Sequence, residues 1–220
     1  MVKNILISAV IVVFNQNLLA FELSSYSNLY KTKNGVVLET LENLEGNKWV
    51  IRSNAKHSLF QLEQETYFEY SEGEIILIEG FRYMSILGGL RKDNQSYKLD
   101  RVNNVIEYNF NRNRGKVKGI KNFYDNLTMQ LQMKIDISSK ESNKLKYDYF
   151  DKGKLKSKEF IQPKNHSSSS LSETIIRLRE KRDDTRLFEI WLDKNINLKT
   201  VKVIQSGPGF KINWILDSKS

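Results

Sequence analysis

The amino-acid sequence predicts a mainly β protein, folded as an antiparallel sheet or open barrel, that follows a cleaved signal peptide. Three observations lead to this prediction: an apolar N-terminal run of secretory length, β-prone runs joined by short turns, and no long helical pattern between those runs. The chain has 220 residues, 40% of them hydrophobic, and no cysteine. A chain of this length forms one domain whose core needs no disulfide or metal to be stable.

The first 20 residues have the layout of a secretory signal peptide. Lys3 supplies a positive start, and residues 5–14 form an apolar run that is too short to span a bilayer. Ala20 is the small residue before the expected cleavage, which makes Phe21 the first residue of the mature chain. We therefore expect a signal peptide at 1–20, a periplasmic location, and no transmembrane span in the mature chain.

The rest of the chain is a series of β-prone runs separated by polar or glycine-containing turns. The runs at 64–70 and 74–79 flank a turn at 71–73, which is a hairpin signal. Residues 163–172, which are rich in serine, are expected to form a flexible loop within a single β-rich domain at 21–220. The other predicted strands are 36–41, 48–53, 104–110, 116–120, 186–192, 200–205 and 210–216.

One segment, residues 125–137, fits both a strand and a helix. Apolar residues occupy every odd position from 127 to 137, which is the alternation of a strand. However, Asp125 is also a good helix N-cap, and Leu127, Leu131 and Ile135 recur at the spacing of one helix face. Residue chemistry alone leaves both interpretations open.

The sequence contains no recognisable catalytic or metal-binding pattern. Without cysteine, and with His57 and His166 as its only histidines, the chain has no thiolate or multi-histidine metal site. We interpret His57 as a surface or loop residue, and His166 lies in the serine-rich loop, where a catalytic geometry is hard to hold. We expect no catalytic residue, no cofactor and no metal.

Charged residues supply two further candidates. Glu63, Glu65 and Glu69 share one face of a predicted strand, as a carboxylate-dependent glycan hydrolase would require, although a solvated face explains them more simply. The net charge is +9, and cations in the middle third alternate with aromatic residues. An exported protein does not meet nucleic acid, so the polyanions available to it are anionic lipid headgroups, phosphorylated glycolipid or acidic polysaccharide. A solvated basic surface that binds no polyanion is the simpler explanation of these cations. The cations are Arg82, Arg91, Lys92, Lys98, Arg101, Arg112, Arg114, Lys116, Lys118 and Lys121, and the aromatic residues are Tyr83, Tyr97, Tyr108 and Phe110.

Three short stretches have the order and spacing of a known family. The first is Phe68-Glu69-Tyr70 with Gly73, followed by Phe81-Arg82-Tyr83, and the second is 125–133, which opens with Asp-Asn-Leu-Thr. The third is 185–192, in which Arg186 precedes Trp191-Leu192, followed by 201–203. From about Tyr30 to the C-terminus, the chain thus resembles the bacterial family known as domain of unknown function 3108. It departs from the family at 160–176, where the serine-rich loop replaces a Thr-Pro-x-Gly turn.

This resemblance implies an exported β-rich domain with no established activity. It also implies a curved sheet of the lipoprotein-carrier class wrapped over a short helix, which assigns 125–137 to that helix. Leu127, Leu131 and Ile135 would then face the concave side of the sheet and line an apolar cavity suited to an acyl chain. Asp125, Arg186 and Trp191 are expected to organise the fold, and replacing Asp125 with alanine should cost about 1 kcal/mol through loss of a helix cap.

Together these inferences predict a non-catalytic periplasmic protein that binds an apolar or amphiphilic envelope ligand, such as a lipid, glycolipid or polysaccharide. The alternative is an assembly factor that docks on an envelope protein through exposed sheet edges and has a fully packed core. A glycan hydrolase that uses carboxylates alone is the third hypothesis, and it requires two carboxylates facing each other across a cleft.

Overall fold

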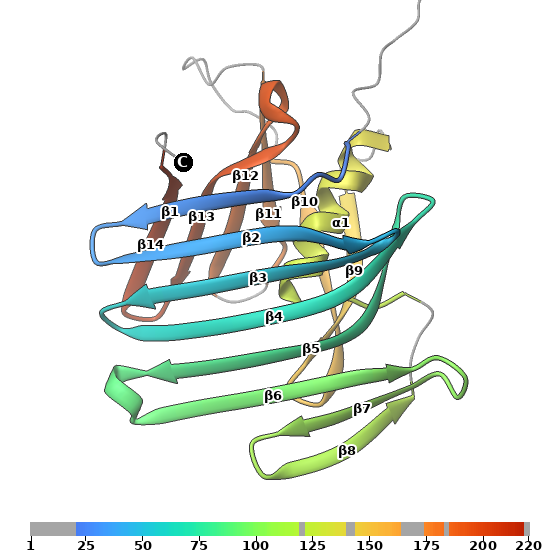
Figure 1. The fold of residues 1–220 in the computed structure, drawn as a ribbon. Helices are drawn as coiled ribbons and strands as arrows, with labels where there is room; N and C mark the ends of the chain where they lie inside the picture. The colour runs from blue at the N-terminus through green and yellow to red at the C-terminus, as the bar shows by residue number, and fades with distance from the viewer. Residues whose placement is uncertain (1–20, 119–121, 140–143, 164–173, 183–184, 218–220) are drawn as a thin grey trace, which may run out of the picture.

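The computed structural model describes residues 21–118, 122–139, 144–163, 174–182 and 185–217, which form one large antiparallel sheet and one α-helix (Figure 1). The predicted signal peptide at 1–20 and most of the serine-rich loop lie outside the described residues. Within the described part of the chain, no helix is long and apolar enough to cross a membrane. The elements are β1 (Tyr26–Thr32), β2 (Gly35–Glu45), β3 (Lys48–His57), β4 (Phe60–Ser71), β5 (Glu74–Ile86), η1 (Leu87–Gly89), β6 (Arg91–Asp100), β7 (Val105–Phe110), β8 (Asn113–Lys118), α1 (Asn126–Ser139), β9 (Lys144–Asp151), β10 (Lys154–Ile161), β11 (Ile175–Glu180), β12 (Leu187–Asp193), η2 (Lys194–Ile196), β13 (Lys199–Gly207) and β14 (Phe210–Leu216).

The sheet has 14 strands in the order β8-β7-β6-β5-β4-β3-β2-β1-β14-β13-β12-β11-β10-β9. Its two halves, β1–β8 and β9–β14, are joined where β1 pairs with β14, and they face each other across α1 (Figure 1). β8 and β9 are the two edges, and no ladder among the described residues joins them, so the barrel is open. The prediction of a mainly β protein with a curved antiparallel sheet and a short helix is confirmed.

Helix α1 fills the concave side of the sheet. It is buried around most of its circumference, so its apolar residues need not be confined to one stripe. This explains why residues 125–137 show an alternation that also fits a strand. The structure forms the helix that the family resemblance implied. The main core combines residues of α1 with residues from both halves of the sheet, among them Met129, Leu131, Met133, Phe68, Leu77, Phe160 and Ile190.

Each of the nine predicted strands is present, although several are longer than their β-prone runs. β1, β6, β9, β10 and β11 were not predicted. β2 continues to Glu45, β3 to His57 and β5 to Ile86, because each keeps pairing with its neighbour beyond the apolar run. The predicted strands 104–110 and 116–120 left five residues for the turn between them, but the turn has only two. In this turn Asn111 adopts a φ of 55°, which asparagine tolerates better than most residues.

The β9–β10 hairpin closes part of the gap between the two edges through side chains. Near its tip, the Phe150 ring lies 5.4 Å from the Tyr97 ring of β6 and 5.7 Å from the Tyr108 ring of β7. Gly153, in the turn of the hairpin, has a φ of 72° and lies directly against the Tyr108 ring. The tip therefore packs on the inner face of the opposite half of the sheet.

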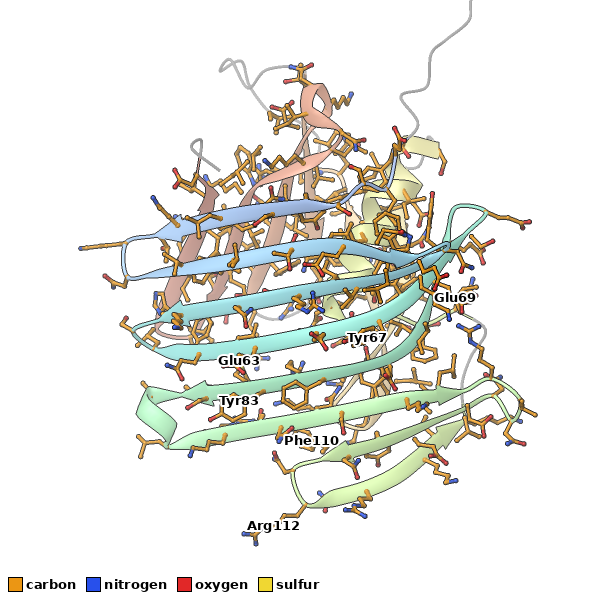
Figure 2. The ribbon with its side chains drawn as sticks, viewed as in Figure 1. Glu63, Tyr67, Glu69, Tyr83, Phe110 and Arg112 are labelled. Atoms are coloured by element: carbon orange, nitrogen blue, oxygen red, sulfur yellow. The ribbon has the colours of Figure 1, made fainter. Side chains whose placement is uncertain are left out.

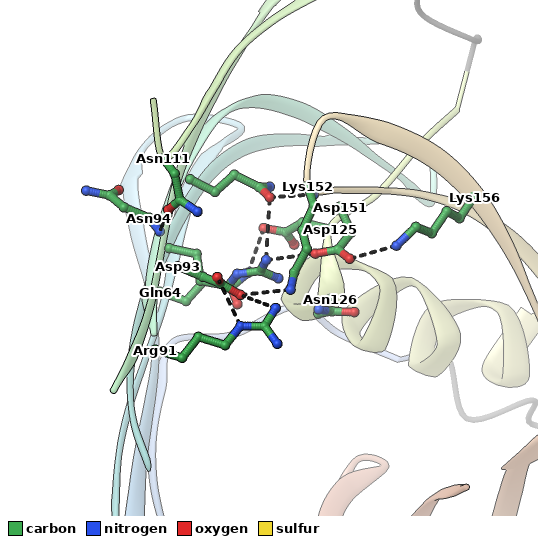
Figure 3. A network of polar contacts seen from close by, with 12 residues as sticks. Gln64, Arg91, Asp93, Asn94, Asn111, Asp125, Asn126, Asp151, Lys152 and Lys156 are labelled. Atoms are coloured by element: carbon green, nitrogen blue, oxygen red, sulfur yellow. Dashed lines mark hydrogen bonds and ion pairs between the residues drawn. The ribbon is translucent and has the colours of Figure 1, made fainter. Parts of the chain in front are cut away.

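Polar contacts fasten the same tip to β5 and β6, and we call the residues that make them the latch: Arg82, Asp93, Gln95, Asp151 and Lys152. Figure 3 labels Asp93, Asp151 and Lys152 of this group. Arg82 Nη2 lies 2.7 Å from Asp151 Oδ1, and Lys152 Nζ lies 2.7 Å from Asp93 Oδ2. The backbone N–H of Lys152 donates to Gln95 Oε1 at 2.6 Å. The open sheet is therefore closed by ion pairs and aromatic packing in place of a strand ladder.

Candidate ligand groove on the outer face

The outer face of β4–β8, which points away from α1, contains a groove of about 820 Å³. Strand register brings its side chains together, with Glu65 opposite Phe81 and Tyr67 opposite Glu79. Figure 2 shows this face, with Tyr67 on β4 toward the viewer. The side chains that line the groove are those of Glu65, Tyr67, Glu79, Phe81, Ser96, Lys98, Glu107, Asn109, Arg114 and Lys116.

Two glycines form the floor of this groove. A Cβ at Gly80 would lie 2.5 Å from the hydroxyl of Tyr97, and one at Gly115 would lie 2.6 Å from the hydroxyl of Tyr108. The two tyrosines therefore press against the glycine backbone from the concave side, and both contribute to the lining of the groove.

Most charged groups in the groove are paired. Lys116 Nζ lies 2.5 Å from Glu107 Oε1, and Lys98 Nζ lies 3.7 Å from Glu79 Oε2. Glu65 Oε2 receives the Nε–H of Arg52 at 2.5 Å. Arg114 is exposed and forms no ion pair with any residue that the structure describes. The groove therefore holds one guanidinium whose charge is not balanced by a carboxylate.

The carboxylate Glu65 is held in its ionised form. Burial by itself raises the pKa of Glu65, but hydrogen bonds from Arg52 and Tyr67 and the charge of Arg52 outweigh burial and lower it. A glycosidase acid needs a raised pKa, so Glu65 has the opposite of the property required for proton donation.

The groove combines an unpaired cation, hydrogen-bonding groups and aromatic surface. Phe81 is 41% exposed, and Asn109 Nδ2 donates to Ser96 Oγ at 3.3 Å beside it. Aromatic side chains pack against the apolar face of a ligand, while hydroxyl, amide and guanidinium groups bind its polar substituents. A sugar ring that carries an anionic group presents both kinds of surface.

Inside the molecule, Asp125 connects α1 to the sheet. Its Oδ1 accepts the backbone N–H groups of Leu127 at 3.0 Å and Thr128 at 2.9 Å, and the hydroxyl of Thr128 at 2.8 Å. These contacts place Asp125 at the N-cap of α1, and the N–H of Asp125 in turn donates to Thr128 Oγ1 at 3.1 Å.

The second oxygen of Asp125 faces β4 and β6. Asp125 Oδ2 accepts Gln64 Nε2–H at 2.9 Å, the hydroxyl of Tyr97 at 2.8 Å and the hydroxyl of Thr66. Burial and the neighbouring Asp125 charge raise the pKa of Tyr97 well above its usual value, so the phenol stays a donor. All of these groups are buried, which makes Asp125 a structural junction inaccessible to a ligand.

A second pocket, of about 640 Å³, lies at the C-terminal end of α1 beside the β4–β5 turn and β9. Asp136 is buried there and accepts the hydroxyl of Tyr147 at 2.8 Å and Gln132 Nε2–H at 3.1 Å. Phe21, the residue that follows the expected signal cleavage, also lines this pocket. Ile135 lines it as well, whereas Leu127 and Leu131 do not.

The other candidates of the sequence analysis are dispersed over the molecule. Leu127, Leu131 and Ile135 are packed in the main core with 6%, 1% and 4% of their surface exposed. Trp191 Nε1 donates to Glu189 Oε1 at 2.7 Å on the outer face of β12, and Arg186 directly precedes this strand.

The predicted histidine and glutamate candidates do not form a common site. His57 stacks on Phe60 with ring centroids 5.3 Å apart, and its Nδ1 accepts the N–H of Leu59. His166 lies outside the described residues. Glu63 shares the outer face of β4 with Glu65 but does not line the groove, and Glu69 is paired with Arg101 at 2.9 Å.

The basic residues of the middle third lie at several different places on the sheet. Lys98, Arg114 and Lys116 line the groove, and Arg82 belongs to the latch on the concave side. Arg91 and Lys92 lie at one end of the sheet, beside η1, and Lys121 lies outside the described residues. Sequence reasoning missed Phe81, Glu79, Ser96 and Asn109 as groove residues, although strand alternation around Glu65 was a signal for their common face.

No protein-family model and no curated protein sequence matches this chain. Its fold is similar to the crystal structure of a β-barrel-like protein of domain of unknown function DUF1849 from Brucella abortus, with a TM-score of 0.56 over 90% of this chain and 98% of that chain. The two sequences are 10% identical, so the likeness concerns the fold alone. The chain is therefore a β-barrel-like protein by fold, and its relation to domain of unknown function 3108 stays a prediction.

Proposed function

We propose that this protein is a non-catalytic binding protein of the bacterial envelope, and that its outer groove binds an acidic saccharide presented by a glycolipid or a polysaccharide. The observation that carries the proposal is the guanidinium of Arg114, which no described carboxylate pairs, in a groove that also exposes Phe81. A carboxylate or phosphate on a sugar ring would pair with Arg114, and the apolar face of the ring would lie against Phe81. Such a ligand is amphiphilic when the saccharide carries a lipid.

The arrangement of the acidic residues supports binding without hydrolysis. Each of Glu65, Glu79 and Glu107 has a cationic partner within 4.0 Å. Hydrolysis needs one carboxylic acid that remains protonated near neutral pH, together with a second carboxylate. The lowered pKa of Glu65 favours a role in positioning polar groups over a role as an acid.

Titration calorimetry with oligogalacturonate as the anionic probe and cello-oligosaccharide as the neutral probe tests this proposal. We expect binding of the anionic probe, and loss of about tenfold or more in affinity for Arg114→Met, since hydrogen bonds to charged groups contribute about 1.5–3 kcal/mol. Phe81→Ala should weaken binding of both probes. Lys194→Met removes the same charge from an exposed position in η2, away from the groove, and should bind like the unmodified protein.

Equal affinity for the two probes, or equal losses for Arg114→Met and Lys194→Met, would contradict an acidic saccharide site. The export part of the proposal has its own test. Intact-mass measurement of protein recovered from the periplasm of an expression host should show a chain that begins at Phe21. A mass that retains residues 1–20 would contradict cleavage after Ala20.

The assembly-factor alternative has two observations in its favour. Leu127 and Leu131 of α1 are fully packed, as expected for a protein that carries no acyl chain in its core. β8 also has one edge that pairs with no other described strand. A protein that binds neither saccharide but crosslinks to an envelope protein through residues of β8 would support this alternative.

A further inference from the structure

One end of the sheet brings together the turns at 33–34, 58–59, 87–90 and 208–209, and we call it the turn end. The N–H of Ser58 donates to the carbonyl oxygen of Asn34 at 3.0 Å, and the N–H of Leu87 donates to that of Leu59 at 2.8 Å. The last turn belongs to the same end, because Trp214 of β14 lies 5.8 Å from His57 between ring centroids. In Figure 1 the tips of the β1–β2, β3–β4 and β5–β6 hairpins lie along the left side.

The turn end exposes large apolar side chains at the tips of its turns. Leu90 is 86% exposed, Leu87 55%, Phe210 44% and Leu59 40%. Leu87 has a φ of 51°, a left-handed conformation that leucine rarely adopts, and Gly88 and Gly89 continue it with φ of 65° and 102°. The turn that exposes Leu87 and Leu90 therefore keeps an unfavourable backbone conformation. Such strain, and apolar side chains exposed together at a surface, are both typical of functional positions.

The charge of the turn end is of one sign. Its turns and their flanking residues contain the cations Lys33, Arg91, Lys92 and Lys211 and no acidic residue. Asp93, which follows in β6, is buried and paired with Lys152 and Arg91.

The turns of the far end differ, because they contain or adjoin Glu45, Glu72, Glu74 and Asp100 together with the cations Lys48 and Arg101. Cations without acidic neighbours in the turns are thus found at the same end as the exposed leucines.

We propose that the turn end docks on an anionic lipid surface, with Leu59, Leu87, Leu90 and Phe210 entering the headgroup region. Exposed apolar side chains surrounded by cations are the combination that binds such a surface, since burial of apolar area and attraction to anionic headgroups act together. A protein partner would need the area around the leucines to be complementary in shape, whereas a lipid surface needs only the exposed apolar tips and the positive charge. This site is separate from the outer groove, and it does not depend on what the groove binds.

The absence of cysteine allows a position-specific test. Two variants, Leu90→Cys and Val102→Cys, are labelled at the new cysteine with an environment-sensitive nitrobenzoxadiazole. Each labelled protein is then mixed with phosphatidylcholine vesicles that contain or lack phosphatidylglycerol. Val102 is the matched control, because it is 94% exposed in the β6–β7 turn at the far end. Both labels sit on exposed side chains, so neither substitution threatens the fold.

We expect the label at 90 to brighten and shift to shorter wavelength with vesicles that contain phosphatidylglycerol, and the label at 102 to stay unchanged. Arg91→Gln with Lys92→Gln in the Leu90→Cys background should weaken vesicle binding by roughly 25-fold, since each cation near an anionic surface contributes about 1 kcal/mol. An unchanged signal at 90, an equal change at 90 and 102, or an equal response to vesicles without phosphatidylglycerol would overturn the proposal.

Discussion

At the scale of the residue, one buried carboxylate organises the contact between α1 and the sheet. Asp125 accepts hydrogen bonds from the first turn of α1 through Oδ1 and from β4 and β6 through Oδ2. A helix cap on the surface would satisfy only the backbone donors of the helix. In this protein the same side chain also satisfies Gln64, Thr66 and Tyr97, which are buried and would otherwise lose their acceptor.

Replacing Asp125 should therefore cost more than the loss of a cap. We expect Asp125→Ala to lower the free energy of unfolding by about 3 kcal/mol or more, because each buried donor left without an acceptor costs about 1–3 kcal/mol. Thr66→Val, which removes one donor together with its requirement for an acceptor, should cost clearly less. Urea denaturation of the two variants measures the difference. A loss of only about 1 kcal/mol for Asp125→Ala would reduce its role to capping.

At the scale of the element, the sequence indicated strands where local signals are strong. The turn at Glu72 and Gly73 has φ of 53° and 79°, which suits a two-residue hairpin turn, one residue shorter than the turn predicted at 71–73. Pro208 and Gly209 likewise form a tight turn between β13 and β14. β6 was missed because its sequence, Arg-Lys-Asp-Asn-Gln-Ser-Tyr-Lys-Leu-Asp, is polar on both faces. Its inward positions hold Asp93 and Gln95, which belong to the latch. Both contact Lys152, which is distant in the sequence, so no local sequence pattern reveals why these polar residues face inward.

The groove was equally hard to predict, for a related reason. Its side chains come from five strands, β4–β8, and only the strand order and register bring them to one face. Glu65, Lys98, Arg114 and Lys116 were singled out as charged residues. Their placement in one groove depends on pairings that local sequence does not specify.

Two glycines in turns of the same sheet separate the effect of backbone conformation from the effect of packing. Gly153 has a φ of 72°, and a Cβ there would lie 2.5 Å from the Tyr108 ring. Gly46 has a φ of 58° and no atom within 4 Å of such a Cβ. Gly46→Ala should cost about 1 kcal/mol through the left-handed conformation alone, whereas Gly153→Ala should cost about 1–3 kcal/mol more, because Tyr108 must move. Equal losses in thermal or urea unfolding would show that the hairpin tip does not pack on Tyr108.

At the scale of the whole molecule, the sheet is closed by side chains at the position where a barrel would have a ladder. Phe150 packs on Tyr97 and Tyr108, and the latch surrounds this contact with ion pairs. Arg82 and Asp151 are 12% and 14% exposed, so their interaction is screened less than that of a surface pair. At this gap, the two halves of the sheet are therefore held together in part by interactions that depend on charge.

The closure should weaken in acid. Burial by itself raises the pKa of Asp151, but the charges of Arg82 and Lys156 and their hydrogen bonds outweigh burial and lower this pKa. In the same way, Lys152 and Arg91 lower the pKa of Asp93. A carboxylate whose folded pKa is lowered stabilises the protein above its unfolded pKa of about 3.9, and this contribution is lost as the pH falls further through the folded pKa.

Asp151→Asn should cost about 1.5–3 kcal/mol near pH 7, and the difference between this variant and the unmodified protein should shrink below about pH 4. Glu107→Gln, which removes an exposed ion pair with Lys116, is the control and should change stability little at any pH. If the cost of Asp151→Asn stayed constant down to about pH 2, the latch carboxylate would not be the source of the acid sensitivity.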